Sequence, residues 1–68
     1  MNLVIQSEQE DDGRWLAEVL ELPGTLTYGQ SREEAISKVK ALTLRVLADR
    51  LEHGENDSNL DSVYFVAA

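Results

Sequence analysis

The chain has 68 residues, enough for a single domain spanning residues 1–68, and it lacks cysteine, which excludes disulfides and cysteine-based zinc sites as supports for so small a core. Thirteen acidic and six basic residues give a formal net charge of -7, which argues against nucleic acid and anionic membranes as direct partners because both repel an acidic surface. No apolar run approaches the ~20 residues of a membrane span, so we expect a cytoplasmic protein that gains further burial as a dimer or larger oligomer.

The first half of the chain predicts three β-strands joined by short loops. A β-prone run at residues 3–7 is followed by an acidic, glycine-containing loop. The run "RWLAEVLEL", residues 14–22, predicts a second strand, in which Trp15, Ala17 and Val19 share one face while Leu16, Glu18 and Leu20 share the other. Pro23-Gly24 ends this strand, and residues 25–29 form a third one. Three consecutive strands with short connections make an antiparallel meander.

A long helix follows the meander. Ser31 with Glu34 three positions later forms a capping box, which predicts a helix over residues 32–53. Apolar residues then recur at three- and four-residue steps, and Gly54 offers a stop. The stripe consists of Ala35, Ile36, Val39, Leu42, Thr43, Val46 and Leu47. Residues 54–59 read as a polar loop and residues 60–68 as a fourth strand.

The order β-β-β-α-β predicts an α+β domain. Because a crossover between parallel strands is right-handed, the fourth strand is expected beside the first, in the sheet order 3-2-1-4, with the helix on one face. The other face would then be bare. Strands two and four carry apolar residues on both sides, so we expect another chain to cover one of these faces.

Six apolar residues are candidates for oligomer or partner contacts. The helix would be ~33 Å long, whereas a strand of this length spans ~20–23 Å, so the C-terminal half of the helix should overhang the sheet. Three leucines form a flank there, although packing on the last strand or on the loop after Gly54 is an equally good interpretation. Trp15 is a candidate anchor, with core packing as the stronger alternative. The candidates are Trp15, Leu44, Leu47, Leu51, Tyr64 and Val66.

The sequence offers little that could support catalysis. His53, the one histidine, lies at the expected helix end, where its charge would favour the helix dipole. The acidic stretch Glu8 to Asp12 matches no metal-binding pattern, and the glycines at 24 and 29 have turn spacing that does not fit a phosphate-binding loop. We therefore expect no enzyme activity, no cofactor and no metal.

The stretches "DGRWLAEVLELPG" and "TYGQSREEAISKVKALTLRVL" resemble the HicB-like antitoxin family. The family pattern is an Asp-Gly pair, an aromatic-rich strand, Glu-Leu-Pro-Gly, a short strand ending in glycine, and Ser or Thr with Glu-Glu-Ala at a helix start. It corresponds here to Asp12-Gly13, residues 15–19, Glu21 to Gly24, Gly29, Ser31 and Glu33 to Ala35. The resemblance covers roughly residues 3–54 and implies a partial RNase H-like β-β-β-α-β domain. The first strand has no central aspartate for nuclease chemistry.

The resemblance implies the antitoxin of a type II toxin–antitoxin system, which binds and masks a small basic RNA-cleaving toxin, HicA. It also implies a dimer or tetramer. Many members carry a C-terminal DNA-binding domain. Because the sequence ends at Ala68, we expect a short form without it and no direct contact with nucleic acid. The alternative is an orphan homo-oligomeric module of the same fold that binds a small molecule or another protein.

Overall fold

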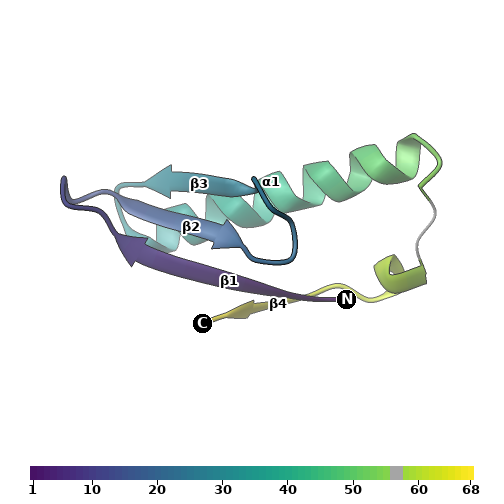
Figure 1. Ribbon diagram of the computed structural model, residues 1–68, viewed down its shortest axis with the longest axis horizontal. Coiled ribbons are helices and arrows are strands. Elements are labelled where there is room, and N and C mark those ends of the chain that lie inside the picture. Colours follow the sequence, from purple (N-terminus) through teal and green to yellow (C-terminus); the bar gives the residue numbers. More distant parts are fainter. Residues whose placement is uncertain (56–57) are drawn as a thin grey trace.

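The fold was obtained as a computed structural model, which describes residues 1–55 and 58–68. Three strands come first, followed by a long helix, a short 3₁₀ helix and a last strand (Figure 1). The elements are β1 (Asn2–Gln9), β2 (Trp15–Val19), β3 (Leu26–Gly29), α1 (Arg32–Glu52), η1 (Ser58–Asp61) and β4 (Tyr64–Ala67). The chain is therefore an α+β protein with the predicted β-β-β-α-β order.

The four strands form one mixed sheet in the predicted order β3-β2-β1-β4. β1 pairs antiparallel with β2, which pairs antiparallel with β3, whereas β4 lies parallel to β1. The helix lies on one face, mainly over β2 and β3, and its C-terminal half extends beyond the strands (Figure 1). Among the described residues, no helix is both long and apolar enough to cross a membrane.

All four strands differ from their predicted bounds: β2 covers Trp15–Val19 instead of residues 14–22, and β3 starts one residue later than predicted. The changes in β1 and β4 follow from strand pairing. β1 continues to Gln9 because its last three residues pair with β2, where Ser7 lies opposite Ala17. β4 starts at Tyr64, later than predicted, because its first partner is Asn2, where β1 begins. The residues before it have no strand to pair with, and η1 occupies part of that stretch.

The core lies between the sheet and α1. Leu3 and Ile5 from β1 and Ala17 and Val19 from β2 are buried on the side that faces the helix. The helix contributes a stripe with four-residue spacing, as its sequence periodicity predicts: Ala35, Val39, Thr43 and Leu47. The Thr43 hydroxyl, the one polar group in this stripe, donates to the Val39 carbonyl at 2.7 Å.

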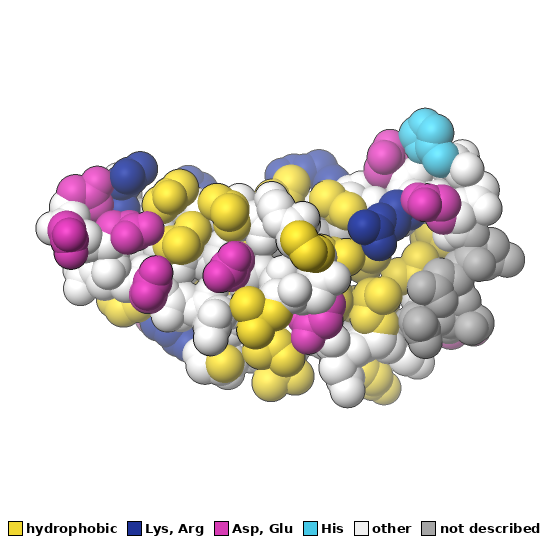
Figure 2. Space-filling model, in the orientation of Figure 1, with side chains coloured by type: hydrophobic (Ala, Val, Ile, Leu, Met, Phe, Trp, Pro, Cys, Tyr) yellow, Lys and Arg dark blue, Asp and Glu magenta, His cyan; other side chains and the backbone are white. Residues whose placement is uncertain are grey.

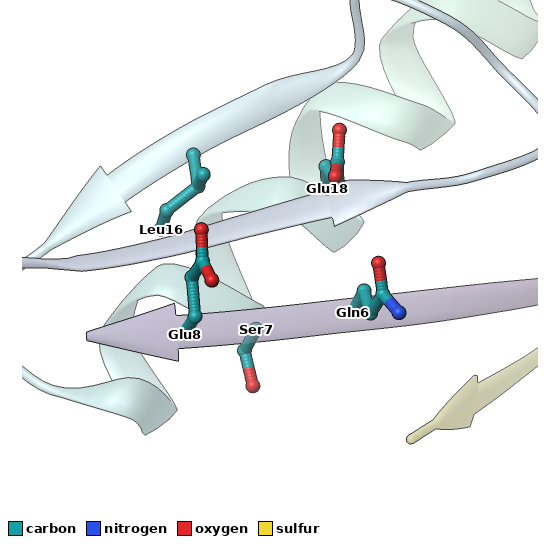
Figure 3. A pocket seen from close by; sticks show the side chains of 5 residues that line it. All are labelled: Gln6, Ser7, Glu8, Leu16 and Glu18. Atoms are coloured by element: carbon teal, nitrogen blue, oxygen red, sulfur yellow. The ribbon is translucent and has the colours of Figure 1, made fainter. Parts of the chain in front are cut away.

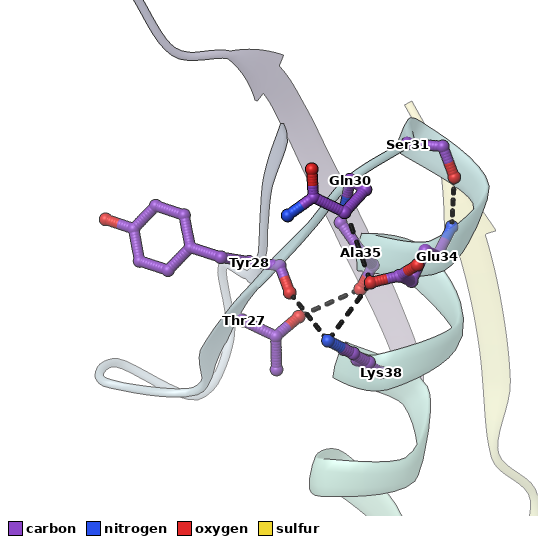
Figure 4. Close-up of polar contacts among 7 residues, drawn as sticks. All are labelled: Thr27, Tyr28, Gln30, Ser31, Glu34, Ala35 and Lys38. Carbon is purple, nitrogen blue, oxygen red and sulfur yellow. Dashed lines mark hydrogen bonds and ion pairs between the residues drawn. The ribbon is translucent and has the colours of Figure 1, made fainter. Parts of the chain in front are cut away.

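The junction between β3 and α1 is held by short local contacts (Figure 4). The Ser31 hydroxyl accepts a hydrogen bond from the Glu34 amide at 3.1 Å, as expected for an N-cap. The Glu34 carboxylate accepts from the Gln30 amide at 3.3 Å, one residue before the donor that a capping box uses. The Thr27 hydroxyl donates to the Ala35 carbonyl at 2.8 Å, so β3 is bonded to the first turn of the helix.

The Glu21 to Gly24 stretch turns the chain between β2 and β3. Leu22 is buried, and its amide donates to the Val19 carbonyl at 3.2 Å. Gly24 has a φ of +88°, which favours glycine, and the turn continues as the Thr25 amide donates to the Leu22 carbonyl. The Glu21 carboxylate accepts from the Val4 amide at 2.9 Å. This stretch is therefore a structural turn that is fastened to β1.

Candidate functional site

The face of the sheet turned away from α1 carries exposed or half-buried apolar side chains along all four strands. We call it the open face, and its apolar members are Val4, Leu16, Leu20, Leu26, Tyr28, Tyr64 and Val66. The most exposed of them range from 40% for Leu26 to 61% for Tyr64. Strand alternation produces this face, because the residues between the buried core positions must point the other way. In Figure 2 the sheet lies in front of the helix, and hydrophobic side chains gather over it with acidic ones among them.

Strand register mixes apolar and acidic residues on the open face. Leu16 lies between Tyr28 on β3 and Glu8 on β1, and Glu18 lies between Leu26 and Gln6. At the other end of the sheet, Val4 lies opposite Val66, and Tyr64 lies opposite Asn2. Cross-strand neighbours of this kind are in side-chain contact distance. The open face is therefore one apolar band with carboxylates in it.

A shallow hollow of about 80 Å³ lies at the centre of the open face. Gln6, Glu8, Leu16 and Glu18 line it with side chains that stand on the same side of the sheet (Figure 3). Ser7 points the opposite way, toward the helix, where its hydroxyl accepts a hydrogen bond from Arg32 Nε at 3.1 Å. Since a water in the liquid occupies ≈ 30 Å³, the hollow can hold about two or three waters or one small polar group.

The two carboxylates at the hollow have no partner within the described chain. Neither the Glu8 nor the Glu18 carboxylate makes a hydrogen bond or an ion pair with residues 1–55 or 58–68, although Glu18 is only partly exposed between leucines. The hollow is therefore acidic, and its charges are not balanced by the protein itself.

Arg14, the one basic residue among residues 1–29, already interacts with neighbouring side chains. Arg14 Nε lies 2.7 Å from the Asp12 carboxylate, and its guanidinium lies 4.5 Å from the centre of the Tyr28 ring. Hydrogen bonds from the Arg14 amide and then from its side chain lower the pKa of Asp12 below its usual value. The Arg14 side chain thus packs on the Tyr28 ring at the edge of the apolar surface, and the Asp12 carboxylate offsets its positive charge.

Neither protein-family models nor curated proteins nor solved structures give a significant match to this chain. The open face is consequently the feature of the molecule on which a functional proposal can rest.

The six predicted contact residues fall into three groups. Tyr64 and Val66 lie on the open face, and Leu44 and Leu51 are exposed on α1. The expectation that Leu47 shares the exposed flank is wrong, because Leu47 is 5% exposed and continues the buried stripe one turn after Thr43. Trp15 lies on the helix side of the sheet, partly buried against the core, in agreement with the core-packing alternative.

Sequence reasoning did not select the other open-face residues as contacts. Leu16, Leu20, Leu26 and Tyr28 lie at alternate positions from the buried residues of β2 and β3. The apolar character of both faces of β2 and the single predicted helix indicated that one face would be bare, but they did not show which of the two faces the helix covers.

Within residues 1–55 and 58–68, the remaining titratable side chains do not form a second site. No group of three or more His, Cys, Asp or Glu side chains that could hold a metal occurs among the described residues. His53 Nδ1 lies 2.7 Å from the Asp49 carbonyl oxygen, one turn earlier in the same helix end. This contact accounts for the histidine as part of the helix terminus.

Proposed function

We propose that the protein acts without catalysis, by binding another protein, as a HicB-like antitoxin-type module that neutralises a small basic RNA-cleaving toxin. The observation that carries this proposal is the open face. Large apolar side chains such as Leu20, Tyr64 and Val66 stand exposed on the face of the sheet that α1 leaves uncovered. Contiguous exposed apolar surface of this kind marks interaction sites on soluble domains.

The charge of the chain supports a basic partner. A net charge of -7 on 68 residues attracts a cationic protein and repels nucleic acid and anionic lipid. A small RNA-cleaving toxin must itself present cations to RNA, so the same cations would be available to this acidic surface. The resemblance of residues 3–54 to HicB-like antitoxins supports the same partner, in a shared cytoplasmic compartment.

The alternative is an orphan homo-oligomeric binding module of the same fold. Leu44 and Leu51 favour it, because both are about half exposed and lie in the C-terminal half of α1. In this alternative the helix flank joins copies of the chain, and no cognate toxin is bound.

Co-expression with the product of the adjacent reading frame tests the proposal. We expect that product to arrest growth and cleave RNA when expressed alone, to be neutralised when this chain is co-expressed, and to be recovered with it in a pull-down. A product that does not bind, or that stays active when bound, contradicts the antitoxin function. Light scattering of the chain alone then tests whether it is the homo-oligomeric module.

A further inference from the structure

We infer that the open face is the docking surface for the partner, and that the partner presents a flat apolar surface with an arginine or lysine that enters the hollow between Glu8 and Glu18. The inference rests on the proposed protein-binding function and specifies where binding occurs and what chemistry the partner offers. It follows from three features: the uncovered apolar band, the unpaired carboxylates within it, and the distribution of charge between the two sides of the sheet.

Charge is divided unequally between the two sides. Five of the six basic residues belong to α1, where four acidic residues nearly balance them. Residues 1–29, which form the meander, contain six acidic residues and only one basic residue, Arg14. α1 lies behind the sheet, where Arg32 donates to Ser7 on the helix side and Lys38 pairs with Glu34, and Arg14 is already paired with Asp12. The open face therefore presents uncompensated negative charge.

A second copy of the chain is a poor occupant of this face. Packing two open faces together would bring the carboxylates of both copies into one interface without cations, and removing unpaired charges from water is costly. Packing α1 of one copy on the open face of the next would give a heterologous head-to-tail contact, which produces a ring or an open filament and not a two-fold dimer. An acidic partner is a poor occupant for the same reason as two packed open faces, because its charges would meet the carboxylates of Glu8 and Glu18 without cations.

A basic and apolar protein surface would both bury the apolar band and supply a cation for the carboxylates of the hollow. Apolar side chains of the partner would bury Leu20, Val4 and Val66, which supplies the driving force. A guanidinium or ammonium group in the hollow would pair with the carboxylates of Glu8 and Glu18 and contact the side chain of Leu16. The apolar band would thus supply affinity, and the carboxylates would select partners that place a cation at this point.

The inference can be tested with the purified chain and a synthetic probe. The probe is the capped peptide Thr-Leu-Thr-Arg-Thr-Leu-Thr-Leu, in which leucine and arginine share one face of an extended chain. In an NMR titration we expect saturable shifts of the backbone amides of Leu16, Glu18 and Leu20. A matched peptide with glutamate in place of arginine should bind at least about tenfold more weakly, because like charges would then oppose each other.

Variants of the chain separate this surface from the helix. Glu18→Gln should weaken binding of the arginine peptide about two- to fivefold, the effect of one partly exposed charge pair, and should leave binding of the glutamate peptide unchanged or stronger. Tyr64→Ser, at a highly exposed position, should weaken both peptides. Leu44→Ser on α1 is the matched control and should change neither. Thermal unfolding of each variant checks that its fold is retained.

The inference is overturned if the shifts map to α1, if the two peptides bind equally, or if no saturable binding occurs. Its failure can be distinguished from failure of the proposed function. Suppose that the adjacent gene product is neutralised equally by the unchanged chain, by Glu18→Gln and by Tyr64→Ser, but not by Leu44→Ser. The antitoxin function would then stand, and the open face would be refuted as its site. If the peptide binds at the open face but no toxin is neutralised, the open face stands as a binding surface and the antitoxin function is refuted.

Discussion

Substitution of Gly29 by alanine should destabilise the protein through a collision between backbone and Cβ. A Cβ built on Gly29 would lie 2.6 Å from the Ala35 nitrogen and 3.0 Å from the Ala35 Cα. Both are backbone atoms in the first turn of α1, so no side-chain rotation can relieve the contact. The end of β3 and the start of α1 would have to separate, at the place where Thr27 donates to the Ala35 carbonyl.

The magnitude follows from two opposing contributions. Forcing an extra carbon into a packed interface costs typically 1–3 kcal/mol, and a collision with backbone belongs at the upper end of that range. Replacing glycine by alanine restricts the unfolded chain and returns about 0.4–1 kcal/mol. We expect a net loss of about 2 kcal/mol, out of a total that is on the order of 3–10 kcal/mol for a chain of this length. The melting temperature should fall by roughly 8–16 °C.

Urea unfolding followed by far-UV circular dichroism measures this loss. The double variant Gly29→Ala with Ala35→Gly is the decisive control: it removes the Ala35 methyl group but leaves the colliding backbone atoms, so it should not recover stability. Gly13→Ala is a second control, because an added Cβ meets nothing there and only the φ of +93° costs free energy, about 1 kcal/mol. Gly29→Ala with wild-type stability, or full recovery in the double variant, would refute the reasoning.

Three further predictions concern the helix. Leu47→Ala should lower the free energy of unfolding, measured in urea, by about 2–5 kcal/mol because Leu47 is buried. The double variant Leu44→Ser with Leu51→Ser should leave the free energy of unfolding almost unchanged and lower the mass in light scattering. An unchanged mass would show that this flank is not an oligomer contact. Ser31→Ala should cost about 1 kcal/mol through loss of the N-cap, and a neutral effect would show that the cap is replaced by water. Hydrogen bonds from Lys38 and then from the Gln30 amide lower the pKa of Glu34 below its usual value of 4.5. The stabilisation that they give is therefore present above pH 4.5 and is lost as the pH falls through the lowered pKa. Glu34→Gln should reduce the fall in unfolding free energy at acid pH, and an unchanged fall would contradict the assignment.

The sequence predicted the fold well because its signals are local. Alternation in residues 15–19, the turn at Pro23-Gly24 and the cap at Ser31 each specify a conformation over a few residues, and the handedness of the crossover then fixes the strand order. The start of β4 was predicted less well, because it depends on where the partner strand β1 begins, at Asn2, and this pairing is a long-range property.

The candidate site was only partly predictable for a related reason. Alternation shows which residues of β2 share a face, but the position of the helix decides which face is covered. Leu47 illustrates the same limit within α1, since periodicity allowed it to belong to either the core stripe or the flank. The contact of Glu21 with the Val4 amide joins two residues 17 positions apart and has no sequence signal.

The parallel pairing of β4 with β1 has a kinetic consequence for the molecule. β3 and α1 make their contacts across eight to ten residues, from Thr27 to Ala35 and from Tyr28 to Lys38, whereas Asn2 and Tyr64 must meet across 62 positions. The difference in loop-closure entropy is about 2 kcal/mol, so β4 should dock last during folding and leave first during local opening. Each such opening removes Tyr64 and Val66 from the open face, so its apolar band is complete only while β4 stays docked.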